Sequence, residues 1–294
     1  MRRLTEYQPR RFAPSGKRAH YLSIVGSGVD LGILTARLLS GVFSEYTSWR
    51  MVYWTALGLQ YLVFTLLWLL MPDYPSRNNS SFSYSKALCS IPQIVIRNRL
   101  LAICCISIAL MEYNLLSYWT TLTFLLSGSP YNYSSLIISL FALTGMSTMV
   151  LGPICSKWII DQHVPVFSTI LGGVICIAGQ VVGTYTGSFT ISGLVIQALL
   201  LDLGMRIADV ANRVAIYSIN PNAKNTINTA YMLAMFVGQM AGTSGSSKLY
   251  EKGGWIASGS VGMGFTGLAV VIAVLRVFSE KPQLPNNIHQ SNSI

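Results

Sequence analysis

Long apolar runs alternate with short polar segments along almost the whole chain. Eight of these runs have about the 20 residues that a helix needs to cross the ~30 Å hydrocarbon core of a bilayer. We therefore predict an all-α, polytopic membrane protein. Its eight spanning helices are expected at 21–43, 51–71, 100–126, 136–159, 166–185, 189–218, 226–249 and 255–278.

The polar segments divide the chain into predicted units. Residues 73–98 form the longest interruption and are rich in serine and asparagine, which is typical of a linker between helical bundles. We predict a basic cytoplasmic N-terminal segment (1–20), a two-helix unit (21–72), a cytoplasmic central loop (73–98), a six-helix bundle (99–278) and a cytoplasmic tail (279–294). Prolines support several helix ends, at Pro72, Pro75, Pro130, Pro165 and Pro221.

Composition supports a membrane environment. Hydrophobic residues make up 52% of the 294 positions and charged residues only 10%, whereas soluble domains have about 25% charged residues. The five cysteines lie mostly inside apolar runs and predict no disulfide framework. The three histidines, His20, His163 and His289, have neither metal-ligand nor haem-ligand spacing. The sequence therefore predicts no cofactor, and it contains no nucleophile, base or metal constellation that indicates an enzyme.

The positions of lysine and arginine predict the orientation. With the N-terminus inside, the outside loops carry only Arg50, Lys248 and Lys252. This bias predicts that both termini are cytoplasmic, and it accounts for the net charge of +10 without a nucleic-acid partner. The inside segments carry Arg2, Arg3, Arg10, Arg11, Lys17, Arg18, Arg77, Lys86, Arg97, Arg99, Lys157, Lys224, Arg276 and Lys281.

Four charged residues interrupt the apolar run at 189–218. Asp202, Arg206, Asp209 and Arg213 follow one another at i, i+4, i+7 and i+11, which places them along one helix face with alternating signs. An ionisable side chain at bilayer depth costs about 2.5–3.5 kcal/mol on insertion scales, so such residues normally face a protein interior or a wet cavity. The pattern indicates a functional site; the alternative is a structural ladder of ion pairs that joins neighbouring helices.

Two other predicted spans carry ionisable residues. Asp30 and Arg37 lie seven positions apart on nearly the same face, either lining a cavity or packing against partners on other helices. Glu112 is followed by Tyr113, Asn114, Tyr118 and Trp119. A lone carboxylate within a span is a candidate proton site, although a hydrogen-bonded structural acid or a position near the interface would show the same pattern.

Three stretches carry a resemblance to a known family. GSGVDLGILTARLLSGVFSEYTSWRMVYW resembles the fifth helix and following turn of major facilitator superfamily transporters, in a branch similar to drug:proton antiporters. GMSTMVLGPICSKWIIDQ resembles the eighth helix and its cytoplasmic signature, with Ser156 and Gln162 in place of a glycine and a basic residue near Asp161. The run with DLG, VANR and NTAYM, continuing through FVGQMAGTSGSSKLYEKGGW, resembles the tenth and eleventh helices of fungal and bacterial members.

The resemblance covers about residues 15–278 and implies a particular architecture. Members of this superfamily generally have twelve helices in two six-helix bundles around a central cavity. The eight predicted spans would correspond to the fifth to twelfth, so that 21–72 would be a two-helix remnant of the N-terminal bundle. The chain would then be a truncated product or a fragment of a longer transporter. A non-transporting remnant that pairs with partner helices is the alternative.

For function, the resemblance implies secondary transport of a small molecule through the lipid bilayer, coupled to protons. Candidate proton-handling residues are Glu112, Asp202, Asp209 and Asp30, with Arg206, Arg213 and Arg37 as counter-ions or anion contacts. Candidate cavity-lining residues are Asn114, Tyr118, Trp119, Gln197, Asn212 and Gln239. Asn132 matches a glycosylation pattern in a predicted outside loop, whereas Asn78 and Asn79 match it on the predicted inside. The sequence does not distinguish a plasma membrane from a vacuolar membrane as the location of the protein.

Overall fold

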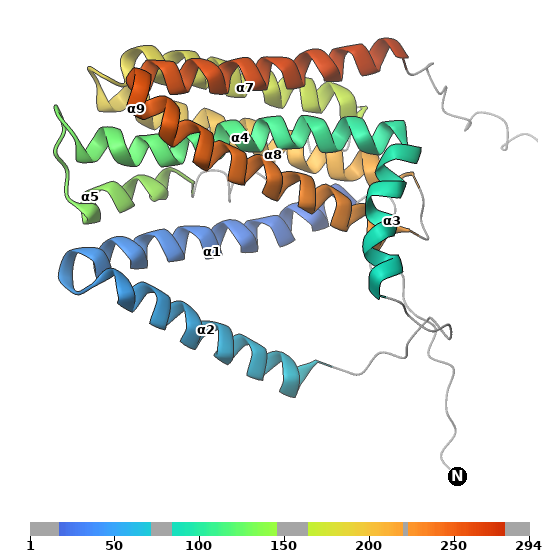
Figure 1. Cartoon of the computed structure of the whole chain (residues 1–294), viewed down its shortest axis with the longest axis horizontal. Helices are drawn as coiled ribbons and strands as arrows, with labels where there is room; N and C mark the ends of the chain where they lie inside the picture. Colours follow the sequence, from blue (N-terminus) through green and yellow to red (C-terminus); the bar gives the residue numbers. More distant parts are fainter. Residues whose placement is uncertain (1–17, 72–83, 146–163, 220–222, 280–294) are drawn as a thin grey trace, which may run out of the picture.

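The protein is described from a computed structural model, which places residues 18–71, 84–145, 164–219 and 223–279 (Figure 1). The side chains of 18–27, 29–30, 84–88, 145 and 279 lie outside this description. Within the described residues every regular element is helical, so the predicted all-α class is confirmed. The elements are α1 (Arg18–Tyr46), α2 (Trp49–Leu70), α3 (Tyr84–Arg97), α4 (Arg99–Ser127), α5 (Ser135–Leu140), the 3-10 helix η2 (Phe141–Gly145), α7 (Pro165–Thr186), α8 (Ile191–Tyr217) and α9 (Lys224–Ser279).

Helix α9 reverses direction at Gly254. The backbone of this residue is non-helical, with φ 69° and ψ −162°, a conformation that glycine adopts without the steric cost of a Cβ atom. Figure 1 shows the consequence: the orange part of α9 crosses the bundle and the dark red part runs back along it. The two parts coincide with the two helices predicted at 226–249 and 255–278.

Among the residues that the structure places, five helices are long and apolar enough to cross a membrane, namely α2, α4, α7, α8 and α9. Helix α1 covers the span predicted at 21–43 and has 29 residues, enough to reach across a bilayer. The span predicted at 136–159 begins in α5 and η2, and the rest of it, together with the signature at Ser156, Asp161 and Gln162, lies outside the described residues.

The helices are arranged as a bundle with a diverging hairpin. Helices α4, α7, α8 and α9 form the bundle, and α1 lies beside α5 and η2 along one side of it (Figure 1). Helix α2 turns back from α1 and diverges from the bundle, so none of its residues is buried. The largest fully buried side chains come from the bundle helices: Tyr118, Tyr231, Leu101, Ile108, Met111, Leu122, Leu126, Leu194, Leu201, Ile207, Ile216 and Ile227.

Helix α3 lies inside the segment that the composition predicts as a linker. Its 14 residues include Ile91, Ile94 and Val95, which share one face and pack against the core of the bundle. The sequence pattern does not predict this helix. Its apolar positions are too few for a membrane-spanning run, and they follow a stretch rich in serine and asparagine. Figure 1 shows α3 lying across the end of the bundle rather than along it.

Glycines on the first part of α9 bring it close to α4. A Cβ atom at Gly242 would lie 2.5 Å from the carbonyl oxygen of Tyr113 and 3.0 Å from its Cα, and one at Gly238 would lie 2.8 Å from the Cα of Ala109. Small residues at such positions allow helices in a membrane to approach closely. This close crossing places the polar residues of α4 and α9 within reach of one another.

We expect Gly242→Val to separate α4 from α9 and to destabilise the protein. The colliding atoms are backbone atoms and cannot rotate away, and overpacking of this kind costs about 1–3 kcal/mol. Thermal unfolding of the purified protein in detergent measures the loss. The control is Gly264→Val on the same helix, where an added Cβ meets no atom within 4 Å. Equal unfolding temperatures for the two variants would contradict the close crossing.

Candidate functional site

The carboxylate of Asp209 is the centre of a buried polar group on α8. Only 8% of the residue is exposed. Both carboxylate oxygens accept from Nε of Arg213 at 3.0 Å, and the hydroxyl of Tyr231 donates to Oδ1 at 3.1 Å. The guanidinium of Arg213 also lies over the Tyr231 ring, 5.1 Å from its centroid. The predicted pairing of Asp209 with Arg213 is thus present, and α9 completes it with a hydrogen bond.

The remaining donors of Arg213 are directed to α9. Its Nη1 donates to the side-chain oxygen of Asn228 at 3.2 Å, and its Nη2 approaches the sulfur of Met235 at 3.3 Å. The hydroxyl of Tyr217 donates to the same oxygen of Asn228 at 2.7 Å. The charged pair on α8 is therefore in contact with three side chains of α9, Asn228, Tyr231 and Met235, and Tyr217 supports Asn228.

Glu112 on α4 has a different environment. It is 4% exposed, and Nε2 of Gln239 on α9 donates to its Oε2 at 3.0 Å. The charges of Asp209, Arg206 and Arg213 act on it electrostatically from α8. Within the described part of the chain, Glu112 makes no ion pair at salt-bridge distance. A neutral amide is thus its partner, in contrast to the arginine that holds Asp209.

A single face of α9 links the two carboxylates. Asn228, Tyr231, Met235 and Gln239 recur at intervals of three or four residues, so they line up along one side of the helix. The first three contact Asp209 or Arg213, and Gln239 contacts Glu112. We call these four residues of α9, together with the charged residues that they contact on α4 and α8, the charge network. Its members are Glu112, Asp209, Arg213, Asn228, Tyr231, Met235 and Gln239.

Asn228 and Tyr231 are not among the residues predicted from the sequence. Their signal is present, because both lie in the NTAYM stretch that carries the family resemblance and both share a helix face with Gln239. Polar residues within an apolar helix are individually weak indicators, since many serve only to join helices. Their spacing relative to Gln239 is the feature that identifies them.

Other predicted residues join helices outside the charge network. The side-chain nitrogen of Asn114 donates to Thr266 on α9 at 2.8 Å, and Thr169 on α7 donates to Asn212 at 3.1 Å. The hydroxyl of Tyr118 donates to the carbonyl oxygen of Leu194 at 2.8 Å. Gln197 is buried against Gly183 of α7. These contacts hold the bundle together, as the structural alternative proposes for such residues.

The remaining predicted charges lie on α8, at Asp202 and Arg206, and on α1, at Arg37 and Asp30. Nη1 of Arg206 is 4.0 Å from Oδ2 of Asp209, at the limit of an ion pair. Asp202 acts electrostatically on Arg37 of α1 and on Tyr118. The guanidinium of Arg37 stacks on the ring of Trp119, 4.0 Å from its centroid. Asp30 lies on α1, but its side chain is outside the described residues.

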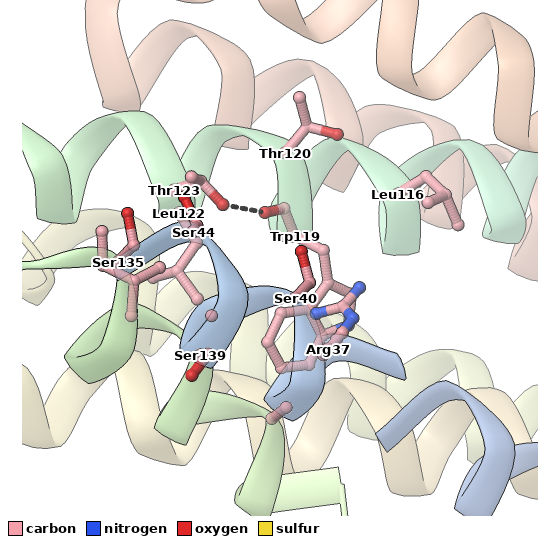
Figure 2. Close-up of a pocket in the computed structure, with 13 residues that line it drawn as sticks. Arg37, Ser40, Ser44, Leu116, Trp119, Thr120, Leu122, Thr123, Ser135 and Ser139 are labelled. Carbon is pink, nitrogen blue, oxygen red and sulfur yellow. Dashed lines mark hydrogen bonds between the residues drawn. The ribbon is translucent and has the colours of Figure 1, made fainter. Parts of the chain in front are cut away.

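A cavity of about 420 Å³ opens between α1, α4 and the α5–η2 segment. Figure 2 shows Arg37 and Trp119 beside each other in its wall, with the hydroxyls of Ser40 and Thr123 among the other labelled groups. Its residues come from the last part of α1, the second half of α4, and α5 with the start of η2, so it lies toward the end of the bundle that carries the α1–α2 turn.

Comparison with known proteins decides the family. The family model described as Major Facilitator Superfamily matches residues 9–220, which is well over half of the chain. The chain belongs to the major facilitator superfamily. The resemblance to the major facilitator superfamily is thereby confirmed, whereas the drug:proton antiporter-like branch stays a prediction. This membership makes the chain a transporter-like, multi-pass membrane protein, and the family is one of transporters and not of enzymes.

Bacterial transporters are among its relatives. The chain is 29% identical over 247 residues to the uncharacterized transporter YgaY of Escherichia coli O157:H7, a match that covers 83% of this chain and 61% of YgaY. It is 25% identical over 265 residues to the probable transporter SCO4007 of Streptomyces coelicolor, covering 88% of this chain and 60% of SCO4007. The chain thus spans about three fifths of the length of these relatives.

Proposed function

We propose that this chain functions in the secondary transport of a small molecule across a membrane, coupled to the movement of protons. The observation that carries the proposal is the charge network, in which two carboxylates are buried within an apolar bundle in different environments. Ionisable residues in membrane helices are costly, and they commonly mark ion and substrate pathways.

Glu112 is suited to exchange a proton. The amide nitrogen of Gln239 donates to the ionised carboxylate, and rotation of the same amide would present its oxygen to a protonated carboxyl group. Either protonation state of Glu112 therefore has a hydrogen-bond partner. Asp209 is suited to a different role, because it forms an ion pair with Arg213 and accepts a hydrogen bond from Tyr231. In this proposal Glu112 carries the exchangeable proton and Asp209 is the fixed charge.

The proposed topology follows the family resemblance. The helices correspond to the fifth to twelfth of a major facilitator fold, in a branch similar to drug:proton antiporters, with both termini in the cytoplasm. The unit boundaries proposed from the sequence at 20, 72, 98 and 278 are kept. In this orientation the cavity lies toward the outer face, and so does the exposed Asn132 in the loop after α4.

The test is uptake by the purified chain in sealed liposomes. A panel of labelled sugars, amino acids, carboxylates and amphiphilic amines is offered with and without an imposed pH gradient. We expect at least one solute to accumulate above its equilibrium concentration, and this accumulation to disappear when the gradient is collapsed with an ionophore. Correctly inserted protein that carries none of the panel in either condition would contradict the proposal.

A second candidate function is association with partner helices, and the observation that favours it is the exposure of α2. None of its residues is buried, and large apolar side chains such as Trp54, Leu62 and Trp68 are exposed on it. Such a helix is covered either by lipid or by partner helices, and partner helices would make the chain one component of a larger assembly. Absence of uptake, together with a defined complex isolated from native membranes through cross-links on α2, would favour this second function.

A further inference from the structure

The cavity between α1, α4 and α5 is lined by hydroxyl groups around a single cation. Arg37 is the charged residue in its wall, and no acidic side chain of the described residues lines it. The hydroxyls come from three helices, α1, α4 and α5 (Figure 2). They belong to Ser40, Ser44, Thr120, Thr123, Ser135 and Ser139.

The four serines form two pairs, one on α1 and one on α5. Ser40 and Ser44 lie four residues apart on α1, and Ser135 and Ser139 have the same spacing on α5, so each pair lies on one helix face. The two helices approach closely because Gly41 has no side chain: a Cβ atom there would collide with Ser139. The close contact at Gly41 therefore joins α1 to α5 beside the cavity.

These hydroxyls offer both acceptors and donors to a ligand. Thr123 and Ser139 donate to carbonyl oxygens of their own helices, at 3.2 and 2.7 Å, which leaves their lone pairs available. Ser40, Ser44 and Ser135 make no side-chain hydrogen bond with any residue that the structure places. A polar molecule in the cavity would find partners of both kinds.

Arg37 is the strongest indicator of the ligand. Its guanidinium stacks on Trp119 but makes no hydrogen bond and no ion pair with the described residues. The charge of Asp202 acts on it without contact at salt-bridge distance. A guanidinium has five N–H donors in a planar fork that matches a carboxylate, and stacking on an aromatic ring leaves that fork open.

We propose that this cavity binds a small organic carboxylate, whose carboxylate group pairs with Arg37 and whose other polar groups contact the serine hydroxyls. The inference rests on the proposed function, since it names the class of solute that is transported. A cationic solute would meet only positive charge in the cavity wall, and a neutral one would leave the guanidinium fork without a partner. The volume of about 420 Å³ is in the range of small-molecule sites.

Thermal unfolding of the purified full chain in detergent tests the inference, with matched pairs of probes. Benzoate and 2-naphthoate are each compared with the corresponding amide, which has nearly the same shape and no charge. We expect the carboxylates to raise the unfolding temperature and the amides to leave it unchanged. Arg37→Gln is expected to weaken benzoate binding by at least about tenfold, and Arg37→Lys less, because lysine keeps the charge but not the fork.

Arg50→Gln is the matched control. Arg50 also lies over a tryptophan, 5.5 Å from the Trp49 ring centroid, but it is exposed and does not line the cavity. This variant is expected to bind benzoate as the unaltered chain does. Ser40→Leu is a second variant, which fills the cavity while keeping Arg37 and is expected to abolish the benzoate shift.

Two results would overturn the inference. The first is equal stabilisation by carboxylates and amides, and the second is a benzoate shift that survives both Arg37→Gln and Ser40→Leu. Because binding is measured without transport, the two proposals fail separately. Carboxylate binding without uptake would contradict the proposed function alone, and uptake of cations or neutral solutes only would contradict the carboxylate class alone.

Discussion

Replacing Asp209 with asparagine is expected to abolish transport while the protein still reaches the membrane. The change removes the negative charge that Arg213 contacts through Nε at 3.0 Å and leaves that half-buried guanidinium without its counter-charge. If the ion pair contributes about 3 kcal/mol in the limiting step, its loss corresponds to at least about 100-fold in rate. Uptake of the transported solute in liposomes measures the effect.

The geometry explains why this variant should still fold. Asparagine has the shape of aspartate, and its oxygen can still accept from the hydroxyl of Tyr231. Glu251→Gln is the matched control, since this exposed carboxylate lies near the end of the first part of α9 and away from the charge network. Undiminished uptake by Asp209→Asn at normal membrane levels would remove Asp209 from the transport mechanism.

Replacing Glu112 with glutamine is expected to uncouple transport from protons. Glutamine cannot release a proton, but it preserves the hydrogen bond with Gln239 because one amide can donate to the other. We therefore expect the solute to equilibrate across the membrane without accumulating, whatever pH gradient is imposed. Exchange of labelled for unlabelled solute, which needs no net proton movement, is expected to continue.

Glu45→Gln is the control for Glu112→Gln. Glu45 is an exposed carboxylate near the end of α1, so its loss is expected to leave the pH-driven accumulation unchanged. If Glu112→Gln accumulated the solute as the unaltered chain does, Glu112 would be a structural acid held by Gln239. The hydrogen-bonded structural acid, named above as an alternative to a proton site, would then be the correct interpretation of this residue.

The sequence predicts much of the fold because the apolar runs are long and prolines or glycines interrupt them. The helices α4, α7 and α8 match the predicted spans to within a few residues, and the interruption near Gly254 separates the two parts of α9 as predicted. Helix α3 is the clear omission. Its amphipathic face depends on tertiary packing of Ile91 and Ile94 rather than on a spanning run.

The candidate site is predictable only in part, for a related reason. The spacing of Asp209 and Arg213 on one helix determines that they can pair, because residues four apart in a helix are neighbours. No such rule places Gln239 beside Glu112, which are 127 positions apart and meet only where Gly238 and Gly242 bring α9 onto α4. Long-range contacts of this kind need the three-dimensional structure.

The most direct measurement of the central claim is proton movement during transport. A pH-sensitive dye is trapped inside liposomes that contain the purified chain, and the transported solute is added outside with no gradient imposed. We predict a change in internal pH upon addition of the solute, and its absence in Glu112→Gln at equal protein content. Solute entry with no change in internal pH in the unaltered chain would contradict proton coupling through the charge network.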